Sequence, residues 1–244
     1  MKVAIIGATG YGGIELIRLL EQHPYFSIAS LHSFSQVGEC ITNVYPHFQN
    51  VLVHTLQEID VEEIEKEAEI VFLATPAGVS GAGKTPTTMT HFPELYDNLR
   101  IYKVNEHQHI PEIEQMLAEW NRETKPITFS THLIPISRGI MVTLYAKVKR
   151  EMEIEQLQQL YEEAYEQSAF IRIRMQGEFP SPKEVRGSNY CDMGIAYDER
   201  TGRVTIVSVI DNMMKGAAGQ AIQNANIVAG LEETTGLQHM PLYL

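Results

Sequence analysis

The feature that most constrains this chain is a glycine-rich segment close to its first residue. A short apolar run, residues 2–6, leads directly into Gly7, Gly10 and Gly13. Apolar residues then recur over residues 14–20 at the spacing of an amphipathic helix. The sequence therefore predicts a strand, a tight turn and a helix in immediate succession.

Such a turn directs backbone N–H groups and the positive end of a helix dipole at a phosphate. The spacing is G-x-x-G-x-x-G, whereas the commoner dinucleotide pattern is G-x-G-x-x-G. The strand–turn–helix context favours a dinucleotide site, and the alternative is a tight turn that binds nothing. The cofactor-binding residues predicted here are Gly7, Thr9, Gly10, Tyr11, Gly12 and Gly13.

Strand and helix patterns alternate through the first third of the chain. Apolar runs at residues 28–31, 51–53 and 70–74 predict strands, and residues 61–67 predict a helix. This alternation is typical of a parallel, doubly wound sheet. We therefore expect an α/β fold with a Rossmann-like dinucleotide-binding domain over residues 1–80.

The pattern changes beyond Gly81. Helices are predicted at residues 111–120 and 154–167, and strands without regular helical crossovers at 127–135, 140–148, 170–175 and 204–210. This order is typical of an antiparallel sheet with helices on one face. We expect an α+β substrate and oligomerisation domain over residues 81–215, after which a helix within residues 216–231 completes the first domain.

Two further segments extend the predicted cofactor site. After the second strand, Ser33 and Ser35 can donate to a 2′-phosphate, and no carboxylate occurs until Glu39, so the sequence favours NADP over NAD. The alternative is that the serines only fill a polar loop. A second glycine-rich turn, at residues 211–220, can bring Asn212, Gly216 and Gly219 to the cofactor or can serve close helix packing.

Composition excludes several classes of protein. The chain has 244 residues and a formal net charge of −12, which argues against the basic surface that binds nucleic acid. No apolar run approaches the roughly 18 residues of a membrane span. The two cysteines, Cys40 and Cys191, favour a reducing cytoplasm over a disulfide framework.

A second phosphate-binding pattern competes with the first. Residues 78–85 read G-x-x-x-x-G-K-T, the phosphate loop of nucleoside triphosphatases, and Asp211 follows a predicted strand as a magnesium ligand does. Pro86, only two positions after Lys84, is a poor start for the long helix that such a loop opens. We therefore rank this interpretation below the dinucleotide site.

Histidines are the candidate acid–base groups. His107 and His109 precede Pro111, which suits a helix start. On an extended segment, residues two apart face opposite ways, so we expect no shared metal and at most one histidine at a reaction centre. The alternative is that both are surface or capping residues, and His132, on a predicted strand, fits a structural role.

Taken together, these motifs resemble the N-acetyl-gamma-glutamyl-phosphate reductase family, which is related to aspartate-semialdehyde dehydrogenase. The resemblance runs through nearly the whole chain. It rests on residues 7–13, 73–78, 80–84, 106–114, 132–140, 187–189 and 215–224. It implies an oxidoreductase of arginine biosynthesis that uses NADP, a small acyl-phosphate substrate and a homo-oligomeric state, without metal, membrane or nucleic acid.

The resemblance also implies roles for individual residues. It assigns acid–base catalysis to His109, with His107 second, and adds Thr75, Pro76 and Ala77 to the cofactor site. Because the chain is strongly acidic, cations must be concentrated where an anionic substrate binds. The candidate substrate-binding residues are Arg138, Lys84 and Arg186, whose alternative role is in surface ion pairs.

One departure from the family is large. Its reductases carry a long segment with a nucleophilic cysteine, in an Asn-Pro-Gly-Cys context, between the motifs that here meet at residues 78–80. That segment is missing, and neither Cys40 nor Cys191 occupies the matching place. We therefore expect no appreciable activity from this chain, exposed sheet edges and reduced stability. A rival interpretation is a non-catalytic NADP-binding or oligomer-interface paralogue.

Overall fold

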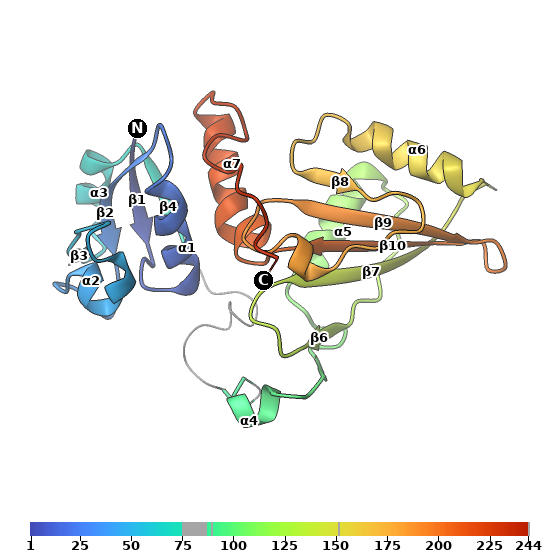
Figure 1. Ribbon diagram of the computed structural model, residues 1–244, viewed down its shortest axis with the longest axis horizontal. Coiled ribbons are helices and arrows are strands. Elements are labelled where there is room, and N and C mark those ends of the chain that lie inside the picture. Colours follow the sequence, from blue (N-terminus) through green and yellow to red (C-terminus); the bar gives the residue numbers. More distant parts are fainter. Residues whose placement is uncertain (75–86, 89, 151, 244) are drawn as a thin grey trace. The chain divides into compact units, whose positions relative to one another are not determined.

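The computed structural model describes residues 1–74, 87–88, 90–150 and 152–243 (Figure 1). The chain forms two compact units. The first comprises Met1–Lys84 with Arg138–Leu244, and the second comprises Thr85–Ser137. The predicted domains are a dinucleotide-binding part at 1–80 with 216–231 and a substrate part at 81–215. They are defined by what each part binds, so they stay a prediction.

The N-terminal part of the first unit contains a parallel sheet with the strand order β3-β2-β1-β4. Its elements are β1 (Lys2–Ile6), α1 (Tyr11–Leu20), β2 (Ser27–His32), α2 (Ile41–Val44), the 3₁₀ turn η1 (Pro46–Phe48), β3 (Leu56–Gln57), α3 (Val61–Glu67) and β4 (Ile70–Leu73). This confirms the predicted parallel sheet and the strand–turn–helix start.

One predicted strand in this part is wrong. Residues 51–53 form no strand, and Val51 and Val53 are exposed. The amides of Val51 and Leu52 both donate to the carbonyl of Phe48, so this backbone closes a turn. The strand lies later, at β3, where Leu56 is buried.

The rest of the first unit contains a second sheet, with the order β7-β10-β9-β8. Its elements are β7 (Ile140–Lys147), α6 (Ile154–Tyr165), β8 (Ile171–Ile173), the 3₁₀ turn η2 (Pro182–Glu184), β9 (Cys191–Asp198) and β10 (Arg203–Ile210). Strands β7, β10 and β9 are antiparallel, whereas β8 runs parallel to β9. The helix α6 packs on one face through Leu157, which lies in one apolar cluster with Ile195 and Val204 (Figure 1).

The second unit is small and is described by itself. It contains α4 (Phe92–Leu95), β5 (Arg100–Tyr102), α5 (His109–Trp120) and β6 (Thr131–Leu133). The strand predicted at 127–135 is limited to β6, which pairs antiparallel with β5. The helix predicted at 111–120 is confirmed as α5.

The C-terminal helix completes the core of the N-terminal sheet. A π-helical turn, η3 (Met214–Ala218), leads into α7 (Gly219–Val228), as predicted from the pattern at 217–231. Ile222 and Met214 are fully buried in one cluster with Ile17 and Leu19 of α1. Residues at the two ends of the sequence therefore share one core.

Two sheet edges are open to solvent. On β4, which pairs only with β1 among the described strands, Val71 and Leu73 are exposed. Every residue of β7 is exposed. The exposed edge expected for the parallel sheet is present at β4 among the described residues, whereas β7 belongs to the other sheet, for which no exposed edge was predicted. In the described part of the chain, no helix is both long and apolar enough to cross a membrane.

One side of α7 is buried in the shared core and the other is exposed, so substitutions on the two sides should differ in their effect on stability. Replacing buried Ile222 with Ala should lower the free energy of unfolding by about 2–5 kcal/mol, because a cavity opens against α1. The matched control is Ile227→Ala on the exposed side of the same helix, with an expected change within about 0.5 kcal/mol. Denaturant unfolding measures both. Equal losses would contradict the packing of α7 on this core.

Candidate functional site

The glycine turn joins the end of β1 to α1. Gly7 has a φ of +84°, and a Cβ there would lie 2.5 Å from the carbonyl oxygen of Ala74. The amides of Gly7 and Ala8 both donate to the carbonyl of His32, at 3.0 and 3.1 Å. The turn is thereby fixed to the C-terminal ends of both neighbouring strands, and only glycine fits at its start.

Gly13 allows α1 to lie close to the end of β1, and Gly10 leaves the N-terminus of α1 without a side-chain cap. A Cβ on Gly13 would lie 2.3 Å from the carbonyl oxygen of Gly7, so this glycine permits the close helix–strand approach. Gly10 is the N-cap of α1, where no side chain caps the helix and no acidic residue lies in the first turn. This end of the helix dipole is therefore suited to an anion such as a pyrophosphate.

The predicted NADP loop follows β2. Ser33 is buried, and its hydroxyl lies 3.1 Å from the hydroxyl of Thr9 and accepts from the amide of Ser35 at 3.4 Å. Ser35 itself is exposed. The hydroxyl of Tyr45 donates to the carbonyl of Thr9 at 2.7 Å. The structure thus brings Thr9 and Ser33 together, and it leaves Ser35 available to a ligand from solvent.

Strand order identifies where a ligand would lie in this sheet. The strand β1 lies between β2 and β4, so the order reverses at the C-terminal end of β1. Ligands of doubly wound sheets bind at such a reversal. The predicted residues Thr75, Pro76 and Ala77 follow β4 directly, but they lie outside the described residues, as does Lys84.

The second glycine turn is organised by a buried carboxylate. Asp211 accepts from the amides of Gly187, Met213 and Met214 at 2.7, 2.8 and 3.1 Å. The side-chain oxygen of Asn212 accepts from the amide of Gly139 at 2.8 Å. These contacts hold the start of η3 in place.

Close packing explains Gly219, the residue at the start of α7. A Cβ there would lie 2.3 Å from the side-chain oxygen of buried Asn189. Gly216 donates its amide to the carbonyl of Asp211. Close packing therefore requires glycine at Gly219, whereas a Cβ on Gly216 would come no nearer than 3.4 Å to any described atom outside its own helix and its chain neighbours. Cofactor contacts by Asn212, Gly216 and Gly219 stay a prediction.

Arg138 lies between two carboxylates. Its guanidinium contacts Glu15 of α1 at 2.9 Å and Asp211 at 2.9 Å, and Arg18 also pairs with Glu15 at 2.9 Å. Burial acts to raise the pKa of Glu15, but the hydrogen bonds from Arg18 and Arg138 outweigh it and lower that pKa. This network ties α1 to the end of β10.

The sequence analysis missed Glu15 and Asp211 as parts of this network. The available signals were a single carboxylate on an apolar helix and an aspartate directly after an apolar strand. Arg186, the third predicted cation, accepts from the amide of Leu242 through its backbone carbonyl. Its contact with substrate stays a prediction.

The two candidate histidines lie at the start of α5, in the second unit. Their ring centroids are 4.8 Å apart, and the amide of His109 donates to Nδ1 of His107. The expectation that they face opposite ways is wrong, because the segment turns into a helix and is not extended. Partial burial and repulsion from His109 and Lys103 lower the pKa of His107.

Both cysteines lie in the first unit. Cys191 is buried beside Ser208, and burial raises the pKa of its thiol. The thiol of Cys40 lies 3.1 Å from the hydroxyl of Thr42, and this hydrogen bond lowers its pKa. His132 is exposed on β6. Among the described residues, no group of three potential ligands could hold a metal.

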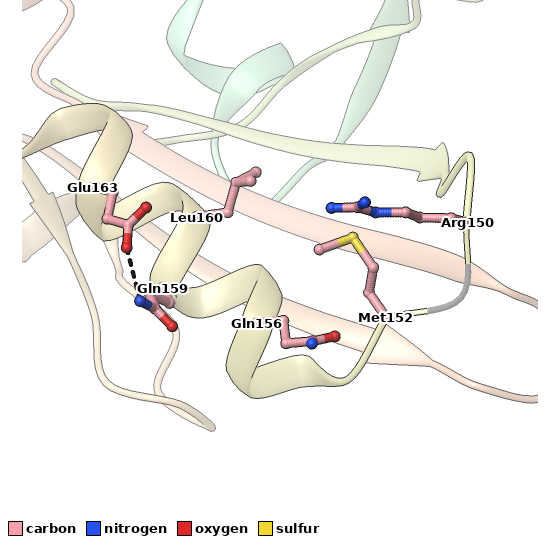
Figure 2. A pocket seen from close by; sticks show the side chains of 6 residues that line it. All are labelled: Arg150, Met152, Gln156, Gln159, Leu160 and Glu163. Atoms are coloured by element: carbon pink, nitrogen blue, oxygen red, sulfur yellow. Dashed lines mark hydrogen bonds between the residues drawn. The ribbon is translucent and has the colours of Figure 1, made fainter.

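Two further regions of the chain are candidates for ligand binding. A pocket of about 450 Å³, shown in Figure 2, is lined by Arg150, Met152, Gln156, Gln159, Leu160 and Glu163. It lies on α6 and on the segment that joins β7 to α6, and it shares no residue with the glycine turn. The other place is the loop at 78–85, which lies outside the described residues. Within the described residues that follow it, the first helix is α4, with four residues, so no long helix supports a triphosphatase.

The ion-pair network predicts a pH dependence of stability. The folded state lowers the pKa of Glu15, so its contribution is present above the pKa of the unfolded chain and is lost as the pH falls through the folded pKa. Glu15→Gln should therefore flatten the fall in the free energy of unfolding as the pH drops through and below the ordinary carboxyl pKa of 4.5. The matched control is Glu65→Gln, at an exposed position on α3. An unchanged slope in Glu15→Gln would contradict the network.

Known proteins match the chain from end to end. A sequence profile of the semialdehyde dehydrogenase dimerisation domain matches residues 48–212. N-acetyl-gamma-glutamyl-phosphate reductases of Bacillus anthracis and Bacillus cereus (strain 03BB102) are 71% and 70% identical over 345 aligned positions, covering 100% of this chain and of each relative. Because the chain has 244 residues, at least 101 of those positions have no counterpart in it. The relatives thus support the absence of a long internal segment.

Solved structures share the fold. Aspartate semialdehyde dehydrogenase II from Vibrio cholerae, complexed with ASA, matches with a TM-score of 0.68 at 15% identity, covering 94% of this chain and 98% of that one. The enzyme from Candida albicans, solved with NADP, matches with a TM-score of 0.62 at 16% identity, covering 93% and 98%. These matches confirm the expected fold class. The sequence matches show that the chain belongs to the N-acetyl-gamma-glutamyl-phosphate reductase family.

Proposed function

We propose that the chain is an NADPH-binding protein built for the reduction of N-acetyl-gamma-glutamyl phosphate to N-acetylglutamate semialdehyde, a step of arginine biosynthesis. The observation that carries the cofactor assignment is the uncapped N-terminus of α1, which is reached through three glycines and contains no acidic residue in its first turn. The relatives' names supply the substrate.

The residues of the glycine turn fit a dinucleotide. The close approaches at Gly7 and Gly13 hold the turn in shape, whereas a Cβ on Gly10 would meet only the carbonyl oxygen of Gly7, at 3.4 Å. Apart from the glycine's own chain neighbours, no other atom of the described residues lies within 4 Å of that Cβ position, which supports the approach of a pyrophosphate to Gly10. Ser35 is exposed beside this turn and can donate to a 2′-phosphate, which supports NADP.

The reaction class requires a thiolate besides the cofactor. A thiolate attacks the acyl carbon, inorganic phosphate leaves, and a thioester remains. Bound NADPH supplies the hydride that reduces this thioester. The resulting hemithioacetal expels the thiolate and gives the aldehyde. We assign proton transfer to His109, with His107 second, which is worth about 100- to 10,000-fold in reactions of this kind.

The cations have separate roles in this proposal. Arg138 already balances Glu15 and Asp211, so we assign it the positioning of α1. We assign direct contact with the phosphate or carboxylate of the substrate to Arg186 and Lys84, as the family resemblance implies. We further propose a homo-oligomer in the cytoplasm, with the dinucleotide-binding part at 1–80 and 216–231 and the substrate part at 81–215.

A second candidate is a protein that holds NADP without turnover. Its support is the state of the two cysteines. Cys191 is buried with a raised pKa, and Cys40 lies in the loop that follows the second strand, far in sequence from the family's nucleophile position. Cys191 is thus covered by protein, and Cys40 does not occupy the position of the family's nucleophile.

Cofactor preference tests the binding part of the proposal. NADPH should bind more tightly than NADH in calorimetric titration, and Gly10→Val should weaken NADPH binding at least tenfold while the chain stays folded. Ser35→Asp should reduce the preference for NADPH by charge repulsion. The matched control is Ser27→Asp, which adds the same charge at the exposed opposite end of β2. Equal or tighter binding of NADH would overturn the assignment.

Turnover tests the catalytic part. In the aldehyde-to-acyl-phosphate direction with phosphate present, NADP reduction at 340 nm should stay far below the roughly 1–1,000 per second of ordinary enzymes, because no thiolate can form the thioester. A Bacillus anthracis relative assayed in parallel is the control. Ordinary turnover that Cys191→Ser or Cys40→Ser abolishes would show that one of these thiols acts. Ordinary turnover in both variants would refute the thioester route.

A further inference from the structure

His23, which follows α1, is a buried titratable residue that the proposed reaction does not use. It is 6% exposed. Its Nδ1 accepts from the amide of Phe26 at 3.0 Å and from the amide of Tyr25 at 3.3 Å. A ring nitrogen that accepts carries no proton, so the single proton of the neutral ring lies on Nε2. The structure therefore fixes both the neutral form of His23 and its tautomer.

The Nε2 side of the ring faces the C-terminal part of the chain. Nε2 lies 3.0 Å from the side-chain oxygen of Asn226 in α7 and 3.1 Å from the carbonyl oxygen of Thr235, and both can accept its proton. The side-chain nitrogen of the fully buried Asn226 donates to the carbonyls of Glu233 and Thr235, at 3.2 and 2.8 Å. One buried His–Asn pair thus holds the loop that follows α7.

Packing holds the same loop against the ring. Phe26 stacks on His23, with ring centroids 4.2 Å apart. Gly236 has a φ of +70°, and a Cβ there would lie 2.3 Å from Cδ2 of His23, so only glycine lets the backbone pass the ring. The next residue, Leu237, is fully buried in one cluster with Leu20 of α1. The chain therefore enters the core directly beside His23.

Further along, the chain reaches the loop that carries Arg186. The amide of Leu242 donates to the carbonyl of Arg186 at 2.6 Å. A Cβ on Gly187 would lie 3.0 Å from the side chain of Leu242, so the two residues are in close contact. We call residues 231–242 the C-terminal strap. It is fastened beside His23 and again beside Arg186.

We propose that His23 is a pH-dependent latch, which holds the C-terminal strap at neutral pH and releases it when Nδ1 is protonated. A proton on Nδ1 would face the N–H groups of Tyr25 and Phe26, so two accepted hydrogen bonds would become contacts between donors. A buried charge without a compensating partner is costly, and release returns the ring to water. An effect on substrate binding rests on the proposed role of Arg186, whereas release of the strap does not.

The groups on the N-terminal side favour the neutral ring. Burial lowers the pKa of His23 below the ordinary 6.5, and the hydrogen bonds with Asn226 and Thr235 only partly offset this. The Met1 ammonium donates to the carbonyl of Tyr25 at 2.7 Å, and its charge lowers the pKa of His23 further. The phenol ring of Tyr25 meets the imidazole edge-on, with centroids 6.5 Å apart.

The groups on the C-terminal side do not stabilise a charged ring. Helix α7 contains no charged residue. The carboxylate of Glu233 in the strap accepts from Gln223 at 2.6 Å. His239, the strap's own histidine, lies 3.4 Å from the side-chain oxygen of Gln22. Burial and the charge of Arg18 lower the pKa of His239, so a test must separate the two histidines.

Hydrogen exchange of the full chain over a range of pH tests the latch. The released ring titrates near the ordinary 6.5 and the latched ring below it, so release takes up a proton. After correction for intrinsic rates, protection of residues 231–237 should fall as the pH drops below 6.5, by up to about tenfold per pH unit. Amides of α1 and α7 should keep their protection. An unchanged strap, or an equal loss in every element, would overturn the proposal.

Substitution identifies the histidine that titrates. In His23→Gln, protection of the strap should no longer depend on pH, whatever its level, because no ring remains to be protonated. His239→Gln, on the strap, and His47→Gln, at an exposed position, should both keep the dependence. A dependence that persists in His23→Gln, or that His239→Gln abolishes, would refute a latch at His23.

A nuclear magnetic resonance titration of the unaltered chain tests the same claim without any variant. The ring nitrogens of His23 should report the Nε2–H tautomer at neutral pH. The protonation of His23 and the signal changes of residues 231–237 should share one midpoint, below 6.5. Neither measurement needs cofactor or turnover, so failure of the proposed function leaves this test intact. Separate midpoints, or the Nδ1–H tautomer, would overturn the latch.

Discussion

The buried carboxylate of Asp211 is the interaction on which the two halves of the first unit depend. It fixes the amides of Gly187, Met213 and Met214, and it pairs with Arg138. Arg138 in turn reaches Glu15 on α1. Asp211 is fully buried, and burying a charge away from water is costly unless hydrogen bonds and an ion pair compensate for the lost hydration. The helix α1, which follows the glycine turn, is thereby tied to the strand β10, which leads into η3 and α7.

The parts of the fold that depend on local chemistry could be predicted from the sequence. The helix α3 has the predicted bounds because Asp60 caps it by accepting from the amides of Glu62 and Glu63. The turn at Gly7 could be predicted because a strand and a helix flank it. The helix α7 was recognisable from its small and apolar residues, although its packing on α1 was not.

The parts that depend on distant contacts could not be predicted. The strand β9 has no clear alternation, since it contains Gly194 and the buried Asp192. Gly194 is required because a Cβ would lie 2.5 Å from the carbonyl oxygen of Glu178. Asp192 is held by Arg172 and Arg174, both at 2.6 Å. A carboxylate in an apolar segment can be seen in the sequence, but its distant partner cannot, and for this reason the pairing of Glu15 with Arg138 was missed at the candidate site.

Loss of an internal segment affects cofactor binding and covalent catalysis, the two functions of a reductase, differently. Phosphate recognition by a glycine turn is local, because the strand, the turn and the helix lie within the first 20 residues. Covalent catalysis needs a thiolate from another segment, and the two cysteines present are placed elsewhere. The account therefore predicts cofactor binding without thioester chemistry, together with sheet edges that are open at β4 and β7.

Hydrogen exchange of the full chain with and without NADPH tests the central claim most directly. If NADPH binds at the N-terminus of α1, amides in residues 7–13 and 33–39 should exchange more slowly with NADPH present. Amides in the second unit's α4, β5 and β6 should be unchanged or change less. Protection that omits residues 7–13 and appears elsewhere would contradict the account, as would the absence of any protection at saturating NADPH.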